Sequence, residues 1–572
     1  MKMLNIGLIR GGMEVPAIDA RNGEARPVIR HFNLPDDREA LRPIAIGVLL
    51  DGRIQERWVL ECVRQAETVP GVKLAALALT SVQPGKSVAV GFHRLFDRID
   101  ERVRCLGERL FAPIDVASQL ALPPLHVKTV RHGDRWHADE AGATTLRRCE
   151  VDLWFCFAAV PPSRLPRSVS RLGAWGIEIG EGVPATNAWA GAAELSAGSA
   201  VTMVSVVDYA EPGDGPLYRS FGATATNSPR RNRLRAVRKG VSFLKRLLER
   251  LTLGRDTWPP LPPATLAAPA PYPRLPAPTV PALARLSWRL ASNWVIHRLP
   301  SRERLEQWQI AYYFTDDDAL GCRFERLRYL VPPEDRFWAD PFAVEYRGRY
   351  FIFFEEFLYH ASKGRLAAVE VFEHADPGAT QVVLEQPYHL SYPFLFAWEG
   401  TLYMIPETAQ NRTVELYRCD EFPQHWHLHQ VLLDNINAVD ATLWRERGRW
   451  WMFVNVAEPD ADNTEELHLY WSATPFGPWA AHPRNPVVSD VRCARPAGPL
   501  FSSGGKLYRP SQDCSVAYGQ SILINRVENL GEDGYRETVV DRIMPGWRED
   551  ALHVHTVCGT KRLRVIDCLM RR

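Results

Sequence analysis

Five glycines in the second half of the chain each precede a short apolar run, and their spacing predicts a repeated β architecture. Gly348, Gly400, Gly448, Gly505 and Gly559 lie 52, 48, 57 and 54 residues apart. A period near 50 residues with short strands is typical of propeller blades of four strands each. We therefore expect residues 301–572 to form a five-bladed β-propeller, in which the apolar strand 308–314 completes the fifth blade.

Polar residues recur at fixed distances from these glycines. Seven residues after the first four glycines stand Glu355, Glu407, Asn455 and Gln512, whereas the fifth copy has Ile566 with Asp567 next to it. Eight residues before three of the glycines stand Asp340, Tyr392 and Asp440. If each glycine is a hairpin turn, these two sets pair and gather at one mouth of a central funnel. Such breaks in an apolar pattern indicate either a ligand site or ties between blades.

Composition narrows the class of protein. The chain is 46% hydrophobic and 24% charged with a net charge of +2, which is ordinary for a globular protein and does not indicate nucleic-acid binding. The ten cysteines show no zinc-site spacing, so we expect no metal, no cofactor and a reducing compartment. Without a signal peptide or an apolar run of membrane-spanning length, we expect a cytoplasmic protein.

The first half of the chain alternates buried strands with helical segments, which predicts an α/β domain with a parallel sheet over residues 41–254. Residues 1–40 form an unassigned N-terminal extension. Residues 255–281 are proline-rich and are typical of a linker, and residues 282–300 are predicted to form an amphipathic helix.

The segment Arg230–Arg250 combines many basic residues with an apolar stripe at helical spacing. A helix of this kind either lies on an anionic membrane surface, at the inner face of the membrane, or is a packed helix with a solvated basic face. Both alternatives remain open from the sequence.

Two stretches of the first half, Leu172–Glu181 and Val201–Asp214, resemble the formyltransferases that use formyl-tetrahydrofolate. The resemblance places the family's catalytic Asn, His and Asp on Gly176, Glu178 and Glu211. Glycine has no donor side chain, and an ionised glutamate repels a developing oxyanion. We therefore expect a formyltransferase-like domain that has lost formyl transfer.

The second half resembles the N-terminal domain of plant glucosamine inositolphosphorylceramide transferases. The motifs that carry this resemblance are Phe337–Phe342, Ser391–Pro393, Val439–Thr442, Ala494–Gly498 and Tyr508–Asp513. The separate glycosyltransferase domain of those proteins has no counterpart here, so the resemblance does not bring their transferase activity with it.

More distantly, the repeats resemble five-bladed glycoside hydrolases. Asp340 and Asp440 match two of that group's three carboxylates, but the third position, on blade four, falls on Arg495–Ala497. Glu355 or Glu407 is the candidate to replace the missing acid, since hydrolysis needs two carboxyl groups. Arg495 favours an anionic group in the funnel, because a guanidinium suits phosphate or carboxylate.

We therefore predict a glycan-biosynthesis protein, of the bacterial polysaccharide kind, whose funnel binds or modifies an activated or phosphorylated sugar. The alternatives are a glycoside hydrolase and a non-catalytic carbohydrate-binding protein. Asp340→Asn and Arg495→Ala are expected to weaken binding with little loss of stability. The candidate catalytic residues are Asp340, Asp440, Glu355 and Glu407. The candidate substrate-binding residues are Trp338, Tyr392, Asn455, Arg495, Gln512, Asp513, His553 and His555.

Overall fold

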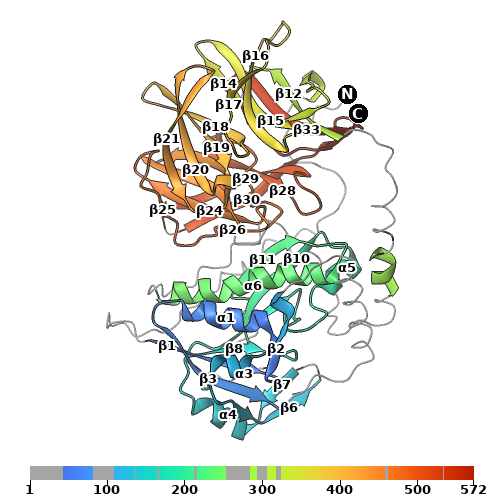
Figure 1. Cartoon of the computed structure of the whole chain (residues 1–572), viewed down its shortest axis with the longest axis vertical. Helices are drawn as coiled ribbons and strands as arrows, with labels where there is room; N and C mark the ends of the chain where they lie inside the picture. The colour runs from blue at the N-terminus through green and yellow to red at the C-terminus, as the bar shows by residue number, and fades with distance from the viewer. Residues whose placement is uncertain are drawn as a thin grey trace, which may run out of the picture. The chain divides into compact units, whose positions relative to one another are not determined.

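The computed structural model describes residues 43–81, 109–252, 284–290, 292, 306–316 and 324–571, except 134, 164, 166–167, 211–214, 458–461 and 533. These residues fall into two compact units, one before and one after residue 300. Figure 1 shows an α/β unit, coloured blue to green, and an all-β unit, coloured lime to red. The predicted N-terminal extension and the proline-rich linker lie outside the described residues.

The α/β unit is built on one seven-stranded sheet with the order β11-β10-β9-β8-β1-β3-β5. Neighbouring strands from β9 to β5 are parallel, but β10 runs antiparallel to both β9 and β11. The sheet is therefore mixed, and the expectation of a purely parallel sheet holds for five of its strands. The strands are β1 Ile44–Leu50, β3 Val72–Thr80, β5 Leu125–Val127, β8 Leu153–Phe157, β9 Ala174–Ile179, β10 Val201–Asp208 and β11 Tyr218–Ala223.

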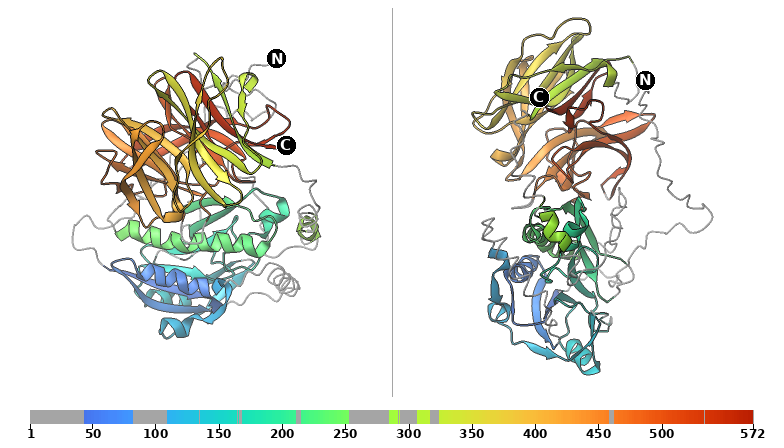
Figure 2. Two further views of the ribbon diagram at one scale, coloured as in Figure 1. Left: turned by 45° about the horizontal axis from the view of Figure 1, so that its top comes forward. Right: turned by 90° about the vertical axis from the view of Figure 1, so that its right-hand side faces the viewer.

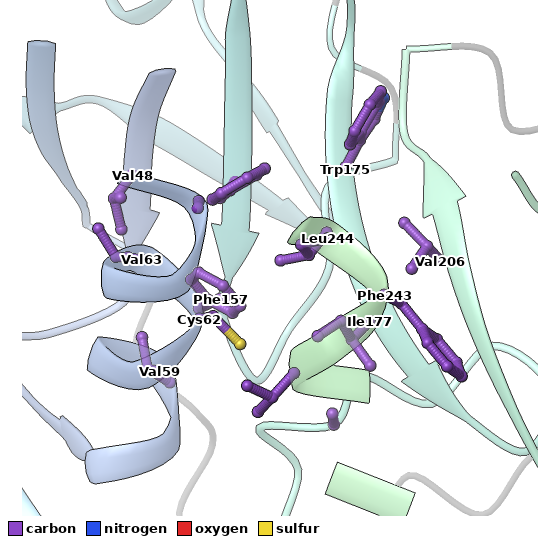
Figure 3. Close-up of a cluster of buried hydrophobic side chains, with 14 of the residues drawn as sticks. Val48, Val59, Cys62, Val63, Phe157, Trp175, Ile177, Val206, Phe243 and Leu244 are labelled. Carbon is purple, nitrogen blue, oxygen red and sulfur yellow. The ribbon is translucent and has the colours of Figure 1, made fainter. Parts of the chain in front are cut away.

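Two helices, α1 (Arg57–Glu67) and α6 (Pro229–Thr252), lie side by side on one face of this sheet (Figures 1 and 2). Strand residues alternate between the faces, so Val48 packs with these helices while Leu49 packs on the opposite face, against α4 (Glu140–Arg147). Figure 3 shows the core under α1 and α6. It labels Val48, Val59, Cys62, Val63, Phe157, Trp175, Ile177, Val206, Phe243 and Leu244.

Smaller elements complete this unit. A β2–β4 pair and a β6–β7 pair are separate two-stranded sheets. The predicted helix 282–300 is described over residues 284–290 as helix, and its Leu286 packs in a small cluster with Trp189 and Leu195. The bounds are β2 Ile54–Glu56, η1 Arg109–Phe111, β4 Pro113–Asp115, α3 Val116–Leu120, β6 Thr129–His132, β7 Arg135–Ala138 and α5 Ala192–Ala197.

The basic segment Arg230–Arg250 is the helix α6, and its apolar stripe belongs to the core of the α/β unit. Leu234, Val237 and Leu244 are at most 3% exposed. Arg233 is also buried, and its guanidinium donates two hydrogen bonds to Glu56. The stripe is therefore not available to enter a bilayer, and contact of the basic residues with a membrane surface stays a prediction. None of the helices described is long and apolar enough to span a membrane.

The all-β unit is a five-bladed propeller, as the glycine repeat predicted. Each blade is a separate antiparallel sheet. Blade one has β14 Arg336–Tyr346, β15 Arg349–Leu358, β16 Lys363–Val371 and β17 Gln381–Leu384. Blade two has β18 Ser391–Trp398, β19 Thr401–Thr408, β20 Thr413–Glu421 and β21 His425–Asp434, with the short helix η4 Ala409–Asn411.

The third and fourth blades follow the same plan. Blade three has β22 Ala438–Glu446, β23 Arg449–Val456, β24 Glu466–Ser472, β25 Ala480–Ala481 and β26 Val488–Ser489. Blade four has β27 Phe501–Ser503, β28 Lys506–Asp513, β29 Ser521–Gly531 and β30 Gly534–Ile543.

The fifth blade joins the two ends of the propeller sequence. Strand β12 (Glu306–Phe314) pairs along its whole length with β33 (Leu563–Arg571), so residues 308–314 do complete the last blade. Figure 1 shows the lime β12 beside the red β33. The blade also contains β13 Arg328–Leu330, β31 Ala551–His553 and β32 Val557–Gly559, with η3 Phe324–Arg326 before β13.

Four of the repeated glycines are hairpin turns. Gly348 has φ 74° and follows Arg347 at φ 52°, a pair of positive angles that defines a tight type I′ turn. Gly400, Gly448 and Gly505 also have positive φ and follow a residue with positive φ. These turns fix the register between the first and second strands of blades one to four. They thereby determine at which point along each strand the polar residues lie.

Candidate functional site

A β-bulge in the first strand of three blades positions the first row of polar residues. The pairing is Ala339 with Glu355, Ser391 with Glu407, and Val439 with Asn455. The predicted pairs were therefore wrong by one residue, because the bulge places two residues opposite one. The displaced residues have left-handed backbones: Asp340 at φ 51°, Tyr392 at φ 44° and Asp440 at φ 58°. Non-glycine residues are uncommon in that region, Tyr more so than Asp, and such backbones persist where the surrounding structure holds them.

Asp340 contacts the fifth blade. Its Oδ1 accepts a hydrogen bond of 2.7 Å from Thr556 Oγ1 and lies 3.1 Å from His555 Nε2. His555 Nδ1 in turn lies 2.9 Å from Asp567 Oδ2. Burial alone would raise the pKa of Asp340, but His555 and Thr556 outweigh it and hold the pKa below its usual value. Asp340 is therefore ionised at neutral pH.

Arg495, which precedes β27 of blade four, contacts two other blades. Its Nε donates to Asp440 Oδ2 at 2.6 Å, and its Nη2 lies 3.3 Å from Asp440 Oδ1 and 3.5 Å from Glu407 Oε2. Its guanidinium also lies 4.9 Å from the centre of the Tyr518 ring. These groups already contact the guanidinium, and binding of an anionic ligand group by Arg495 stays a prediction. Gln512 Nε2 adds a 3.3 Å contact to Asp440 Oδ2.

Glu355 and Glu407 are the carboxyl groups of the site whose pKa values are raised most clearly by burial. Burial raises the pKa of Glu407, and the Asp440 charge adds to it, so that the pKa is about 8. Burial, followed by the charges of Asp340 and Glu407, raises the pKa of Glu355 well above its usual value. Burial also raises the pKa of Asp440, against the opposing charge of Arg495. The site therefore combines Asp340, whose pKa is held below its usual value, with Glu407, whose pKa is raised to about 8.

Asn455 is fully buried, and neither its Nδ2 nor its Oδ1 has a hydrogen-bond partner in the structure. Burial of an amide without hydrogen-bond partners costs free energy. A residue that served to join two blades would make hydrogen bonds that offset this cost. The amide stands at the same register position as Glu355 and Glu407.

We name Asp340, Glu355, Glu407, Asp440, Arg495, His555 and Asp567 the central cluster. Of the five predicted to converge, Arg495 contacts both Asp440 and Glu407, while Asp340 and Glu355 act on each other and on this group through their charges. Asp567 and Tyr518 were missed as site residues. Asp567 comes one residue after the position at which the other four copies of the repeat have a polar side chain. This displaced polar residue was the only sequence signal for it. Tyr518 follows β28 in a segment with no repeat signal.

Other predicted site residues make structural contacts. The Tyr392 hydroxyl contacts Thr442 Oγ1 at 2.8 Å and accepts a hydrogen bond from Gly498 N, which ties three blades. Trp338 donates to Glu356 rather than to the central cluster. Asp513 accepts hydrogen bonds from Ser515, within its own blade. His553 Nδ1 lies 3.2 Å from the Tyr518 carbonyl oxygen.

Three side chains, Asp340, His555 and Asp567, bring possible metal-ligand atoms within 4.8 Å of one another. The two ring nitrogens of His555 each face a carboxylate at ion-pair distance. Burial lowers the pKa of His555, but Asp567 and Asp340 outweigh it and raise the pKa to about 10. Each ring nitrogen of His555 thus has a carboxylate as its neighbour, an arrangement that fits a buried chain of ion pairs.

In the α/β unit, the positions matched to formyltransferase catalytic residues are filled by a buried Tyr–Glu pair. A Cβ on Gly176 would lie 2.5 Å from the Tyr209 ring, and the Tyr209 hydroxyl donates to Glu178 at 3.2 Å. Glu178 is 6% exposed. Glu211 lies outside the described residues.

Comparison with solved structures returns propeller-containing enzymes at low similarity. Zg3597, a family 117 glycoside hydrolase produced by Zobellia galactanivorans, is 12% identical with a TM-score of 0.31, covering 46% of this chain and 91% of that one. The Bombyx mori GH32 β-fructofuranosidase BmSUC1 is 14% identical with a TM-score of 0.31, covering 49% and 61%. At these TM-scores neither structure bears on what the chain does.

Sequence comparison gives the specific result. Glucosamine inositolphosphorylceramide transferase 1 of Oryza sativa subsp. japonica is 35% identical over 212 residues, which is 36% of this chain and 28% of the relative. The protein of the same name from Arabidopsis thaliana is 33% identical over 211 residues, 36% of this chain and 27% of the relative. The chain thus spans less than a third of the length of these relatives. They are plant proteins, which conflicts with the expected bacterial polysaccharide.

A family model described as the N-terminal part of glucosamine inositolphosphorylceramide transferase 1 matches residues 331–551. The match begins before the first strand of blade one and ends at the start of the fifth blade's inner strand β31. The resemblance predicted from the five motifs is therefore confirmed: over residues 331–551 this propeller is similar to the N-terminal domain of the glucosamine inositolphosphorylceramide transferases.

Proposed function

We propose that the central cluster is a sugar-binding site and that the protein acts in the biosynthesis of a glycan or glycolipid. The observation that carries this proposal is the Asn455 amide, which is buried, has no hydrogen-bond partner and stands at the register position of Glu355 and Glu407. The class of ligand comes from the relatives, whose name specifies transfer of glucosamine to inositolphosphorylceramide. Sugar hydroxyls both donate and accept hydrogen bonds, and the cluster offers partners of both kinds.

The charge of the cluster favours the sugar ring over a phosphate group. Arg495 and His555 are its cations, and both are already paired with carboxylates. A phosphate placed here would meet the Asp340 carboxylate without a free cation in the cluster. We therefore place the sugar part of an activated or phosphorylated ligand at the cluster and its phosphate outside it.

A second candidate function is cleavage or transfer at a glycosidic bond. Its support is the opposite ionisation of Asp340, held as carboxylate, and Glu407, held protonated. Two carboxyl groups in different protonation states are what acid–base chemistry at such a bond uses. Glu407 would give its proton to the leaving oxygen while Asp340 takes the proton of the attacking hydroxyl. A non-catalytic binding protein is the remaining alternative.

For the α/β unit we propose a formyltransferase relative that no longer transfers formyl groups. Tyr209 and Glu178 fill the positions at which that chemistry needs an amide and an imidazole. The membrane contact of the basic residues of α6 and a cytoplasmic location also remain proposals.

Calorimetric titration of the full chain with glucosamine, glucosamine 6-phosphate and neutral arabino-oligosaccharides tests the sugar site. We expect saturable binding of glucosamine, weakened about 10-fold or more in Asp340→Asn and in Glu407→Gln, because each removes a polar contact to the ligand. Glu421→Gln, which changes an exposed carboxylate of blade two, is the control and should bind as the wild type does. Absence of binding for every sugar, or wild-type affinity in both cluster variants, would contradict the proposal.

A further inference from the structure

His555 is held between two carboxylates that come from opposite ends of the propeller sequence. Asp340 belongs to β14 of blade one and Asp567 to β33 of blade five, and they lie 3.1 Å from Nε2 and 2.9 Å from Nδ1. The Nδ1 contact is an ion pair that lacks hydrogen-bond alignment. All three residues are at most 3% exposed. Two buried carboxylates this close to one imidazole require the ring to be protonated. With a neutral ring, the two negative charges would repel each other without a cation between them.

Asp567 fixes the backbone around this pair. Its Oδ1 accepts hydrogen bonds from the backbone N–H groups of His555, at 3.0 Å, and Thr556, at 2.9 Å. Its Oδ2 accepts from the backbone N–H of Asp340 at 3.0 Å. That last hydrogen bond reaches the residue whose φ is 51°, so Asp567 helps to hold Asp340 in its left-handed conformation.

Aromatic rings and a glycine restrict the imidazole further. The Trp308 ring centre lies 4.2 Å from that of His555, and the Tyr518 ring centre lies 5.4 Å from it. Gly519, at φ 60°, passes so close that a Cβ there would lie 2.6 Å from the His555 Cβ. The imidazole therefore has little freedom to turn away from Asp340.

The titratable groups that act on His555 come from four strands. Asp340 and Asp567 contact it directly, while Glu355 and Asp440 act at longer range. The charge of Arg495 also helps to lower the pKa of Asp340. Among the described residues, Oδ2 of Asp340 accepts no hydrogen bond, so His555 and Thr556 occupy one oxygen and leave the other for a ligand.

We propose that Asp567 and His555 are positioning residues that hold Asp340 ionised and correctly placed, so that the site forms only when β33 closes the ring. The assignment of Asp340 to sugar binding rests on the proposed function. The contacts of Asp567 and His555 do not, because they are present without a ligand. Closure of the propeller and completion of the site are then one event, since β33 carries Asp567 and also pairs with β12.

Nuclear magnetic resonance of the full chain with isotope-labelled histidine tests the chain of charges without any ligand. An ordinary histidine is neutral at pH 8.5, so we expect an imidazolium signal that persists at this pH and disappears in His555→Gln. His553→Gln is the matched control and should keep it. A spectrum without an imidazolium signal at pH 8.5, or a signal that survives in His555→Gln, would overturn the proposal even if that variant folds poorly.

The pH profile of glucosamine binding supplies the functional readout. Without the His555 charge the pKa of Asp340 rises, so in His555→Gln the loss of affinity on acidification should begin at a higher pH than in the wild type. An unchanged acidic limb in the folded variant would contradict the positioning role. If the imidazolium signal behaves as expected but wild-type protein binds no sugar at any pH, the proposed function fails while the charge chain stands.

Discussion

Replacing Asp567 with alanine should destabilise the propeller by about 3–5 kcal/mol, because it removes one partner of a buried ion pair. The change leaves the backbone N–H groups of Asp340, His555 and Thr556 without their acceptor. It also leaves the His555 charge with Asp340 as its only contacting carboxylate. Hydrogen exchange of peptides from β14 and β33 measures the loss, since these strands belong to the propeller alone.

Asp316→Ala is the matched control, because this exposed aspartate pairs with Arg562 of the same blade and should matter little. The effect has a defined pH dependence. The folded-state pKa of His555 is about 10, above its ordinary value of 6.5, so its stabilising charge is fully present below pH 6.5 and is lost as the pH rises through 10. The difference between wild type and Asp567→Ala should therefore shrink above pH 10. Equal protection in variant and control would contradict this account of Asp567.

Replacing Arg495 with methionine should cost a similar amount, about 3–5 kcal/mol, because Asp440 would remain buried without its cation. Arg495 is 5% exposed and Asp440 is 1% exposed. The sequence pattern predicted that an Arg495 substitution would affect binding and hardly affect stability. The bidentate contact with Asp440 reverses that expectation.

The double variant Asp440→Asn with Arg495→Met separates the ion pair from the rest of the site. Replacing both partners removes the uncompensated charge, so the double variant should be more stable than Arg495→Met alone. Chemical denaturation of the single and double variants gives the coupling free energy. Additive losses would show that the two side chains act independently and would refute the pairing.

The architecture of the propeller could be predicted from its repeat, because glycine turns and strand lengths obey local rules. Asp340, Glu355, Glu407, Asp440 and Arg495 were predicted together for the same reason. The exact strand pairing was not predictable, since a β-bulge leaves no clear mark in the sequence. The partners of Arg495 were not predictable either, because blades meet through contacts between residues far apart in the chain. Asp440 lies 55 residues from it.

The limits differ in the α/β unit. Alternating apolar strands and helices predicted its layers, but not the reversal of β10, because a buried strand reads the same in either direction. The apolar stripe of α6 had two interpretations, a membrane face and a core face, and only the position of the sheet decided between them. Tyr209 was missed because its contact with Gly176 depends on the pairing of β9 with β10.

Asn455→Leu tests the sugar-binding site most directly, because a structural role and a ligand role predict opposite effects on stability. Leucine has a similar shape and no polar atoms, and the amide it replaces has no partner. We expect the variant to melt at the wild-type temperature or above it, while losing the stabilisation that glucosamine gives to the wild type. A lower melting temperature in the variant, or an undiminished response to glucosamine, would contradict the assignment of the central cluster as a sugar site.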